Sequence, residues 1–123
     1  DGVPLDAVVA DFMAGSVEWL TPDNDPDHWD LIEGQGSLFH VSFSGVTMAL
    51  IHGGQPDALI LSHEPTRAHM RGLPRYTLPT LEQLRDTALP LAQVANPACQ
   101  VVQFSGSNAP SQFLFKPHQC FGK

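Results

Sequence analysis

The feature that most constrains the fold is an alternation of helical periods with short apolar runs. Apolar residues recur at helical spacing in three segments, residues 4–20, 43–52 and 80–94. The runs typical of buried strands cover residues 29–32, 58–61 and 99–104. An α-β-α-β-α-β order predicts an α/β domain with a small parallel sheet of about three strands, right-handed crossovers and flanking helices.

Local signals set the expected boundaries. Thr80 and Gln83 form a capping-box pattern at the start of the third helix, and Pro90 should kink that helix or end it early. The pair Gly53-Gly54 should stop the second helix. Residues 66–79 should be an irregular loop, and residues 21–28 an acidic, solvated one. The domain is expected to span residues 1–104, followed by an irregular tail over residues 105–123.

Size and charge restrict the class of partner. A chain of 123 residues has room for one core. Thirteen acidic and six basic residues give a formal charge of −7, which repels phosphate backbones and anionic lipids, so neither nucleic acid nor membrane is expected as a partner. A small-molecule substrate is expected instead. Two cysteines, Cys99 and Cys120, are compatible with a reducing cytoplasm, where we expect the protein to be located.

Ligand-type side chains gather where the strands should end. In open parallel sheets, ligands bind outside the carboxyl ends of the strands. The topology brings five such residues to that rim and places His52 at the opposite edge; the five are Glu33, His40, His63, Glu64 and His69. Imidazole and carboxylate are donors for zinc or another transition metal. Their spacing matches no named metal signature, and hydrogen-bonded loop residues are the alternative interpretation.

A metal at this rim would make a hydrolase the expected function. Metal-bound water with a lowered pKa hydrolyses activated esters, phosphoesters included, with few protein parts. This hypothesis makes Glu33 and Glu64 catalytic as well as ligating, and it requires a divalent metal, with zinc preferred over magnesium or manganese. Cys99 is not a candidate nucleophile, because a thiol within a predicted strand should be buried and inert.

Three stretches of the chain resemble a known family. They are residues 1–12, Asp27-His28-Trp29-Asp30 leading into Glu33-Gly34-Gln35-Gly36-Ser37-Leu38-Phe39-His40, and His63-Glu64-Pro65. Together they resemble a bacterial family of P-loop proteins, long labelled a domain of unknown function, that includes D-amino-acid (D-glutamate) N-acetyltransferases. The resemblance covers about residues 1–102 and implies a truncated P-loop-like domain. The acidic motif is also similar to the Glu-Gly-Ala-Gly of dethiobiotin synthetase, which implies that Glu33 lies beside Mg²⁺ and phosphate.

The chain departs from this family in two ways. The Gly-Lys-Ser/Thr of a phosphate-binding loop occurs nowhere in it, so the amide cradle and its lysine are missing. The segment after Val102 is also unlike the family. The alternative function is therefore a non-catalytic remnant of a D-amino-acid N-acetyltransferase that binds at most a metal or a small anion. A domain reduced in this way leaves a sheet edge and an apolar helix face bare, which predicts a homodimer or a higher homo-oligomer.

Overall fold

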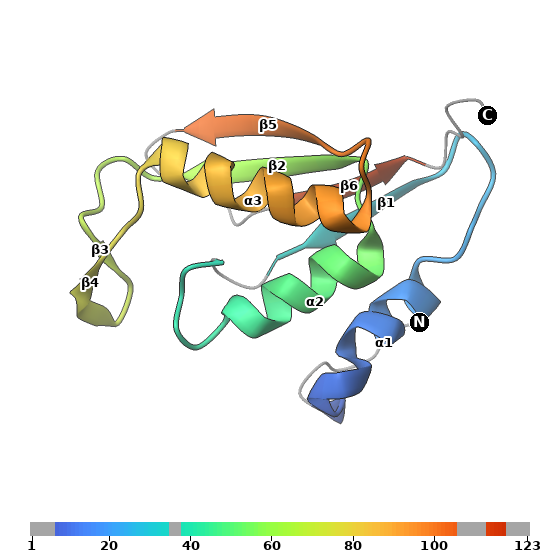
Figure 1. Ribbon diagram of the computed structural model, residues 1–123, viewed down its shortest axis with the longest axis horizontal. Helices are drawn as coiled ribbons and strands as arrows, with labels where there is room; N and C mark the ends of the chain where they lie inside the picture. The colour runs from blue at the N-terminus through green and yellow to red at the C-terminus, as the bar shows by residue number, and fades with distance from the viewer. Residues whose placement is uncertain (1–6, 35–37, 106–112, 118–123) are drawn as a thin grey trace.

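The computed structural model describes residues 7–34, 38–105 and 113–117, and these residues form an α/β fold (Figure 1). The elements, in chain order, are a 3-10 helix η2 (Ala10–Phe12), α1 (Met13–Leu20), β1 (Trp29–Glu33), α2 (Ser44–Gly54), β2 (Ala58–His63), β3 (His69–Met70), β4 (Leu73–Thr77), α3 (Leu81–Ala95), β5 (Gln100–Ser105) and β6 (Phe113–Pro117). The predicted fold class, a small parallel sheet with flanking helices, is confirmed.

The main sheet has four strands in the order β1-β6-β2-β5. Strands β2 and β5 are parallel, with Ala58 opposite Gln100. Strand β6 is antiparallel to both β1 and β2, so β1 runs in the same direction as β2 and β5. The three strands expected from the sequence therefore share one direction, but β1 and β2 are separated by a strand that was not expected.

That additional strand corrects the prediction of an irregular tail. β6 covers Phe113–Pro117, and the last residue of β5 is Ser105, so both fall within residues 105–123. The remaining residues of that range lie outside the described part of the chain. The sequence Phe-Leu-Phe-Lys-Pro has no regular alternation of apolar and polar residues that would predict a strand. β6 forms because the facing edges of β1 and β2 both offer backbone hydrogen bonds.

The helices pack on one face of the sheet. Leu59 and Leu61 of β2 are almost fully buried in a core that also contains Ile51 of α2 and Leu84 and Ala88 of α3. Alternate strand residues point to opposite faces, so this core lies on the face that carries Leu59 and Leu61. Figure 1 shows α3 lying along β2 and β5, with α2 beside it and α1 against α2.

The third helix starts as the sequence predicts but continues further. The Gln83 backbone N–H donates to Thr80 Oγ1 (3.2 Å), and the Thr80 N–H donates to Gln83 Oε1 (2.9 Å). This confirms the capping box. The expectation that Pro90 ends the helix early is wrong, because α3 runs to Ala95. Ala88 and Ala92, on either side of the proline, are fully buried and hold the helix on the sheet.

The first two helices differ from their predicted bounds. Residues 8 and 9 are not helical, residues 10–12 form the 3-10 helix η2, and residues 1–6 lie outside the described part, so the α-helix α1 is shorter than residues 4–20. The pair Gly53-Gly54 does not stop α2 but belongs to it, and the left-handed residue that follows is Gln55 (φ 45°). The missing side chain of Gly53 permits close packing against Ala14 and Val17 of α1, and that of Gly54 permits close approach of Ile32 of β1.

The loop predicted over residues 66–79 contains a hairpin. Strands β3 and β4 pair antiparallel, with His69 opposite Thr77. Gly72 adopts a positive φ of 77° at the turn, which glycine tolerates without strain. The run of arginines and prolines hid this short hairpin from the periodicity analysis. Among the described helices, none is long and apolar enough to cross a bilayer.

Candidate functional site

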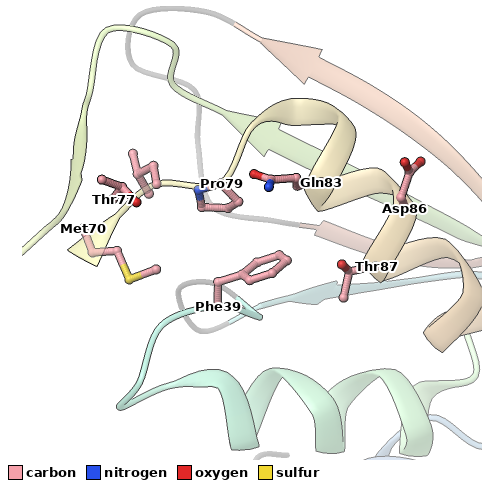
Figure 2. Close-up of a pocket in the computed structure, with 8 residues that line it drawn as sticks. Phe39, Met70, Thr77, Pro79, Gln83, Asp86 and Thr87 are labelled. Atoms are coloured by element: carbon pink, nitrogen blue, oxygen red, sulfur yellow. The ribbon is translucent and has the colours of Figure 1, made fainter.

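The carboxyl ends of β1, β2 and β5 meet at one end of the sheet, beside the β3-β4 hairpin and the start of α3 (Figure 1). A pocket of about 490 Å³ opens there (Figure 2). Its lining residues are Phe39, Met70, Thr77, Leu78, Pro79, Gln83, Asp86 and Thr87. This is the rim where ligands of open parallel sheets bind.

The pocket has an apolar side and a polar side. Phe39 points in from the segment before α2, and Met70 approaches from the hairpin (Figure 2). Gln83, Asp86 and Thr87 share one face of α3, because residues three and four apart are neighbours on a helix. The Asp86 side chain is 64% exposed and pairs with Arg85 at 2.7 Å, so its charge lies at the mouth. The pocket suits a small molecule with hydrogen-bonding groups.

The sequence analysis missed these pocket residues. Phe39 and Pro79 carry no titratable group, and Met70 and Thr77 come from a hairpin that was not expected. The capping box was the only sequence signal near Gln83. None of the five predicted rim residues lines the pocket.

The two glutamates lie apart from the pocket and have separate surroundings. Glu33 is exposed at the end of β1. Glu64 accepts a hydrogen bond from Thr66 Oγ1 (3.1 Å) and forms an ion pair with Arg67. Glu64 is therefore engaged in a local turn, and partly exposed pairs of this kind contribute less than about 1 kcal/mol to stability.

The three histidines of the rim also differ from one another. His40 Nδ1 accepts a hydrogen bond from the Ser42 N–H (3.1 Å), and its ring stacks on Phe43 at 4.5 Å between centroids. His69 is exposed on β3. His63 follows Leu59 and Leu61 on the covered face, and its Nδ1 is buried with no hydrogen-bond partner in the described part of the chain. His40 is thus a hydrogen-bonded loop residue, while the Nδ1 of His63 is closed off from solvent.

These residues do not assemble a metal centre. Within the residues that the structure describes, no group of three or more histidine, cysteine, aspartate or glutamate side chains is placed to hold a metal ion. The described donors therefore do not fit a divalent metal, and we assign no chemical step to one. Whether Glu33, His40, His63, Glu64 or His69 binds a ligand stays a prediction, as does the divalent metal itself.

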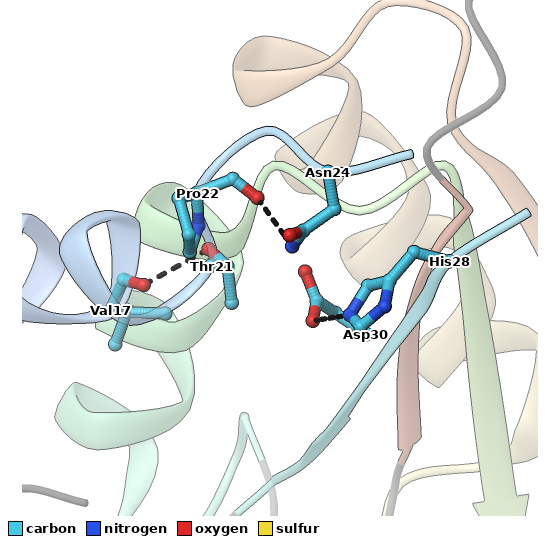
Figure 3. Close-up of polar contacts among 6 residues, drawn as sticks. All are labelled: Val17, Thr21, Pro22, Asn24, His28 and Asp30. Carbon is cyan, nitrogen blue, oxygen red and sulfur yellow. Dashed lines mark hydrogen bonds and ion pairs between the residues drawn. The ribbon is translucent and has the colours of Figure 1, made fainter. Parts of the chain in front are cut away.

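A separate polar cluster lies at the other end of β1 (Figure 3). His28 Nε2 and Asp30 Oδ1 are 3.2 Å apart, and Asn24 Nδ2 donates to the Pro22 carbonyl at 3.0 Å. Thr21 Oγ1 donates to the Val17 carbonyl at the end of α1 (3.0 Å). Each contact joins residues two or four positions apart, so a local structural role at the end of α1, in the acidic loop and at the start of β1 accounts for them.

Cys99 is not a nucleophile. Its side chain is buried, and desolvation, together with the charge of Asp57, raises the pKa of the thiol to about 11. A thiol with so high a pKa stays protonated near neutral pH. The expectation that Cys99 is buried is confirmed.

The elements and the sheet define an α/β domain, and comparison with known proteins identifies its family. Residues 1–111 match the family described as "Domain of unknown function (DUF1611_C) P-loop domain", and the chain belongs to this family. The resemblance noted in the sequence is thereby confirmed.

Two relatives carry a functional name. The chain is 80% identical over 105 residues to a D-glutamate N-acetyltransferase from Tritonibacter scottomollicae, a match that covers 85% of this chain and 32% of the relative. It is 48% identical over 104 residues to a D-glutamate N-acetyltransferase from Pseudoalteromonas sp, which covers 85% of this chain and 31% of the relative. The chain therefore spans about a third of the length of these curated relatives.

These comparisons overturn the hydrolase hypothesis. Both relatives are named acetyltransferases, and neither name indicates ester or phosphoester hydrolysis. The prediction of a metal-dependent hydrolase, with its zinc and phosphoesterase chemistry, is wrong. It failed because the number of histidines and carboxylates near the rim was counted as evidence for a metal site, whereas His40 and Glu64 already have local partners.

Proposed function

We propose that this chain corresponds to a part of a D-glutamate N-acetyltransferase and has no acetyltransferase activity by itself. The observation that carries the proposal is the 80% identity over 105 residues to a relative of that name, of which the chain spans 32%. At such identity the fold and the local surroundings of aligned residues are retained. We infer that the matched region has the same structural role in this chain as the corresponding third has in the relative.

The absence of a phosphate-binding motif supports the proposal that the chain has no acetyltransferase activity by itself. No Gly-Lys-Ser or Gly-Lys-Thr occurs in the sequence. In P-loop proteins the glycine-rich loop presents backbone N–H groups to the phosphates, and its lysine pairs with their charge. A P-loop family chain without that loop has no such site for a phosphorylated ligand.

The pocket at the rim is the part of this chain that we propose contacts a small-molecule substrate in the complete enzyme. Gln83 and Thr87 offer hydrogen bonds beside an apolar wall that includes Phe39 and Met70. The eight lining residues contain one carboxylate and no cationic side chain. They suit an amine or amide group better than a carboxylate, so the cationic partners of D-glutamate's carboxylates would come from elsewhere in the enzyme.

An acetylation assay tests the proposal. Purified chain is incubated with D-glutamate and an acetyl donor, and N-acetyl-D-glutamate is measured by mass spectrometry. The full-length Tritonibacter scottomollicae relative serves as the positive control. We expect product with the relative and none above background with the chain alone. Sustained turnover by the chain alone would refute the proposal.

The cytoplasmic location and the divalent metal expected from the sequence remain predictions that are separate from this proposed function. A cytoplasmic location can be checked by fractionating cells that express the chain. A divalent metal can be checked by elemental analysis of protein purified without chelator. Neither is required by the proposed function of this part of the enzyme.

A further inference from the structure

The helices that the structure describes leave one face of the main sheet uncovered (Figure 1). On β1, Trp29 and Leu31 alternate with residues that face the core, and they are 59% and 65% exposed. On β5, Val102 is 54% exposed, and it lies opposite the half-buried Ile60 of β2. We call the surface formed by Trp29, Leu31, Ile60 and Val102 the bare face.

The strand register places these four residues on the same side. Leu31 and Ala58 both lie opposite position 115 of β6, whereas Ile32 and Leu59 both lie opposite position 114. Ile32 and Leu59 belong to the core on the helix side. The neighbouring row, which contains Leu31, therefore faces away from the helices.

The topology explains why the helices cover a single face. The chain passes from β1 through α2 to β2 and through α3 to β5, always in the same direction across the sheet. Crossovers between parallel strands are right-handed, so successive crossovers in one direction leave their helices on one face. A second layer of helices must come from strands added in the opposite direction, as in doubly wound folds.

The bare face is more apolar than a surface that stays exposed to solvent. Sheets of doubly wound α/β folds are covered by helices on both faces, and exposed apolar side chains gathered on one face mark an interaction site. None of the four residues of the bare face is charged. Glu33 follows Trp29 and Leu31 in the same alternation on β1 and is exposed at the carboxyl end of the strand, so one carboxylate borders the apolar surface there.

We propose that the bare face binds helices from the two thirds of a family chain that this chain does not span. The relatives are about three times as long as the matched region, which covers 32% and 31% of them. The remaining two thirds are long enough to form a second layer of helices. In this topology that layer would pack on the uncovered face of the sheet. A second copy of this chain is the competing occupant, and we infer that the family segment displaces it.

A chimera tests this interface without requiring the missing two thirds to fold alone. In the chimera, this chain replaces the matching third of the Tritonibacter scottomollicae relative. Leu31→Lys should lower the Tm of the chimera by about 5 °C or more, because it buries an unpaired charge. At a concentration low enough to keep the isolated chain monomeric, the same substitution should leave its Tm nearly unchanged, because Leu31 is 65% exposed in the monomer.

Val94 provides the matched control. It is 75% exposed on α3, away from the bare face, so Val94→Lys introduces the same charge and should not shift the Tm of the chimera. A second measurement co-expresses the chain with the remaining two thirds of the relative, so that neither part has to fold alone, and determines the mass of the purified complex by light scattering. A one-to-one complex that Leu31→Lys weakens at least tenfold is expected.

Three results would overturn the proposal. The first is a chimera whose Tm responds equally to Leu31→Lys and Val94→Lys, or to neither. The second is a complex that forms but is insensitive to Leu31→Lys. The third is a homodimer of this chain that persists in excess of the family segment. This inference rests on family membership and not on the proposed activity, so a stable but inactive chimera would count against the function alone.

Discussion

At the scale of single residues, Gly53 sets how closely α1 and α2 approach each other. A Cβ added at Gly53 would lie against the Ala14 carbonyl and 2.7 Å from the Cβ of Val17. Neither neighbour can move freely, since one is backbone and Val17 is 4% exposed in the core. Gly53→Ala should therefore lower the free energy of unfolding by about 1–3 kcal/mol, measured by urea denaturation.

The control for this prediction is Gly15→Ala in α1. Nothing lies within 4 Å of a Cβ added there. Alanine is the better helix former, so this variant should raise the free energy of unfolding by about 0.5–1 kcal/mol. If the two variants change stability equally, close helix packing at Gly53 is not what that position requires.

The second prediction at this scale concerns Cys99 and pH. Burial raises the pKa of the folded-state thiol from 9.0 to about 11. The unfolded chain then ionises first, so the stability contributed by the neutral thiol is complete below pH 9 and is lost as the pH rises toward 11. In a Cys120→Ser background, Cys99→Ala should flatten this alkaline decline in urea midpoint. A decline that is unchanged by Cys99→Ala would assign it to other groups.

Residue types near the rim could be recognised from the sequence, but their partners could not. Glu64 is engaged with Thr66 and Arg67, and His40 accepts the Ser42 N–H. Such short-range hydrogen bonds depend on the turn that the backbone adopts, which no periodicity records. Conversely, the pocket residue Phe39 has no distinguishing chemistry, so only the three-dimensional arrangement identifies it.

At the scale of elements, the start of α3 depends on the Thr80 side chain. Thr80→Ala removes the acceptor of the Gln83 N–H and should lower the free energy of unfolding by about 1 kcal/mol, whereas Thr80→Ser should retain stability. The backbone hydrogen bond of Glu82 and the Thr80 side chain hold the pKa of Glu82 below its usual value. NMR titration should therefore show this pKa rising in Thr80→Ala. An unchanged pKa and stability would mean that the cap is not formed.

The long elements were predictable because their signals are repeated many times. α2, α3, β2 and β5 occur within about two residues of the bounds expected from periodicity. The short elements were not. β3 has only two residues, and β6 ends in Lys116-Pro117 with no regular alternation of apolar and polar residues. Pro90 was misjudged for a related reason, because burial of Ala88 and Ala92 outweighs the one hydrogen bond that proline removes.

At the scale of the whole molecule, the bare face explains the expected self-association. In the absence of the other family segments, two copies can cover each other's Trp29 and Leu31. We predict a dimer of the isolated chain at micromolar concentration, measured by light scattering, and a monomer for Leu31→Lys. Val94→Lys should remain dimeric. A wild-type monomer would refute the dimer, and a dimer unaffected by Leu31→Lys would place its interface elsewhere.

For the molecule as a whole, one kind of sequence pattern predicted the family correctly and another predicted the function wrongly. The stretch from Glu33 to His40 indicated the family, and residues 1–111 match it. The number of ligand-type side chains indicated a metal-dependent hydrolase, which the named relatives contradict. A match to an ordered motif of eight residues is strong evidence for family membership. A set of histidines and carboxylates without a defined spacing is common on acidic surfaces and is weak evidence for a particular activity.

The most direct test of the account measures N-acetyl-D-glutamate formed by the chimera in which this chain replaces the matching third of the Tritonibacter scottomollicae relative. The chain and that relative are 80% identical over the exchanged region, so the chimera should acetylate D-glutamate at a rate within about tenfold of the relative's, while the isolated chain forms no product. A chimera that is as stable as the relative but forms no N-acetyl-D-glutamate would contradict the proposal that this chain corresponds to a functional part of such an enzyme.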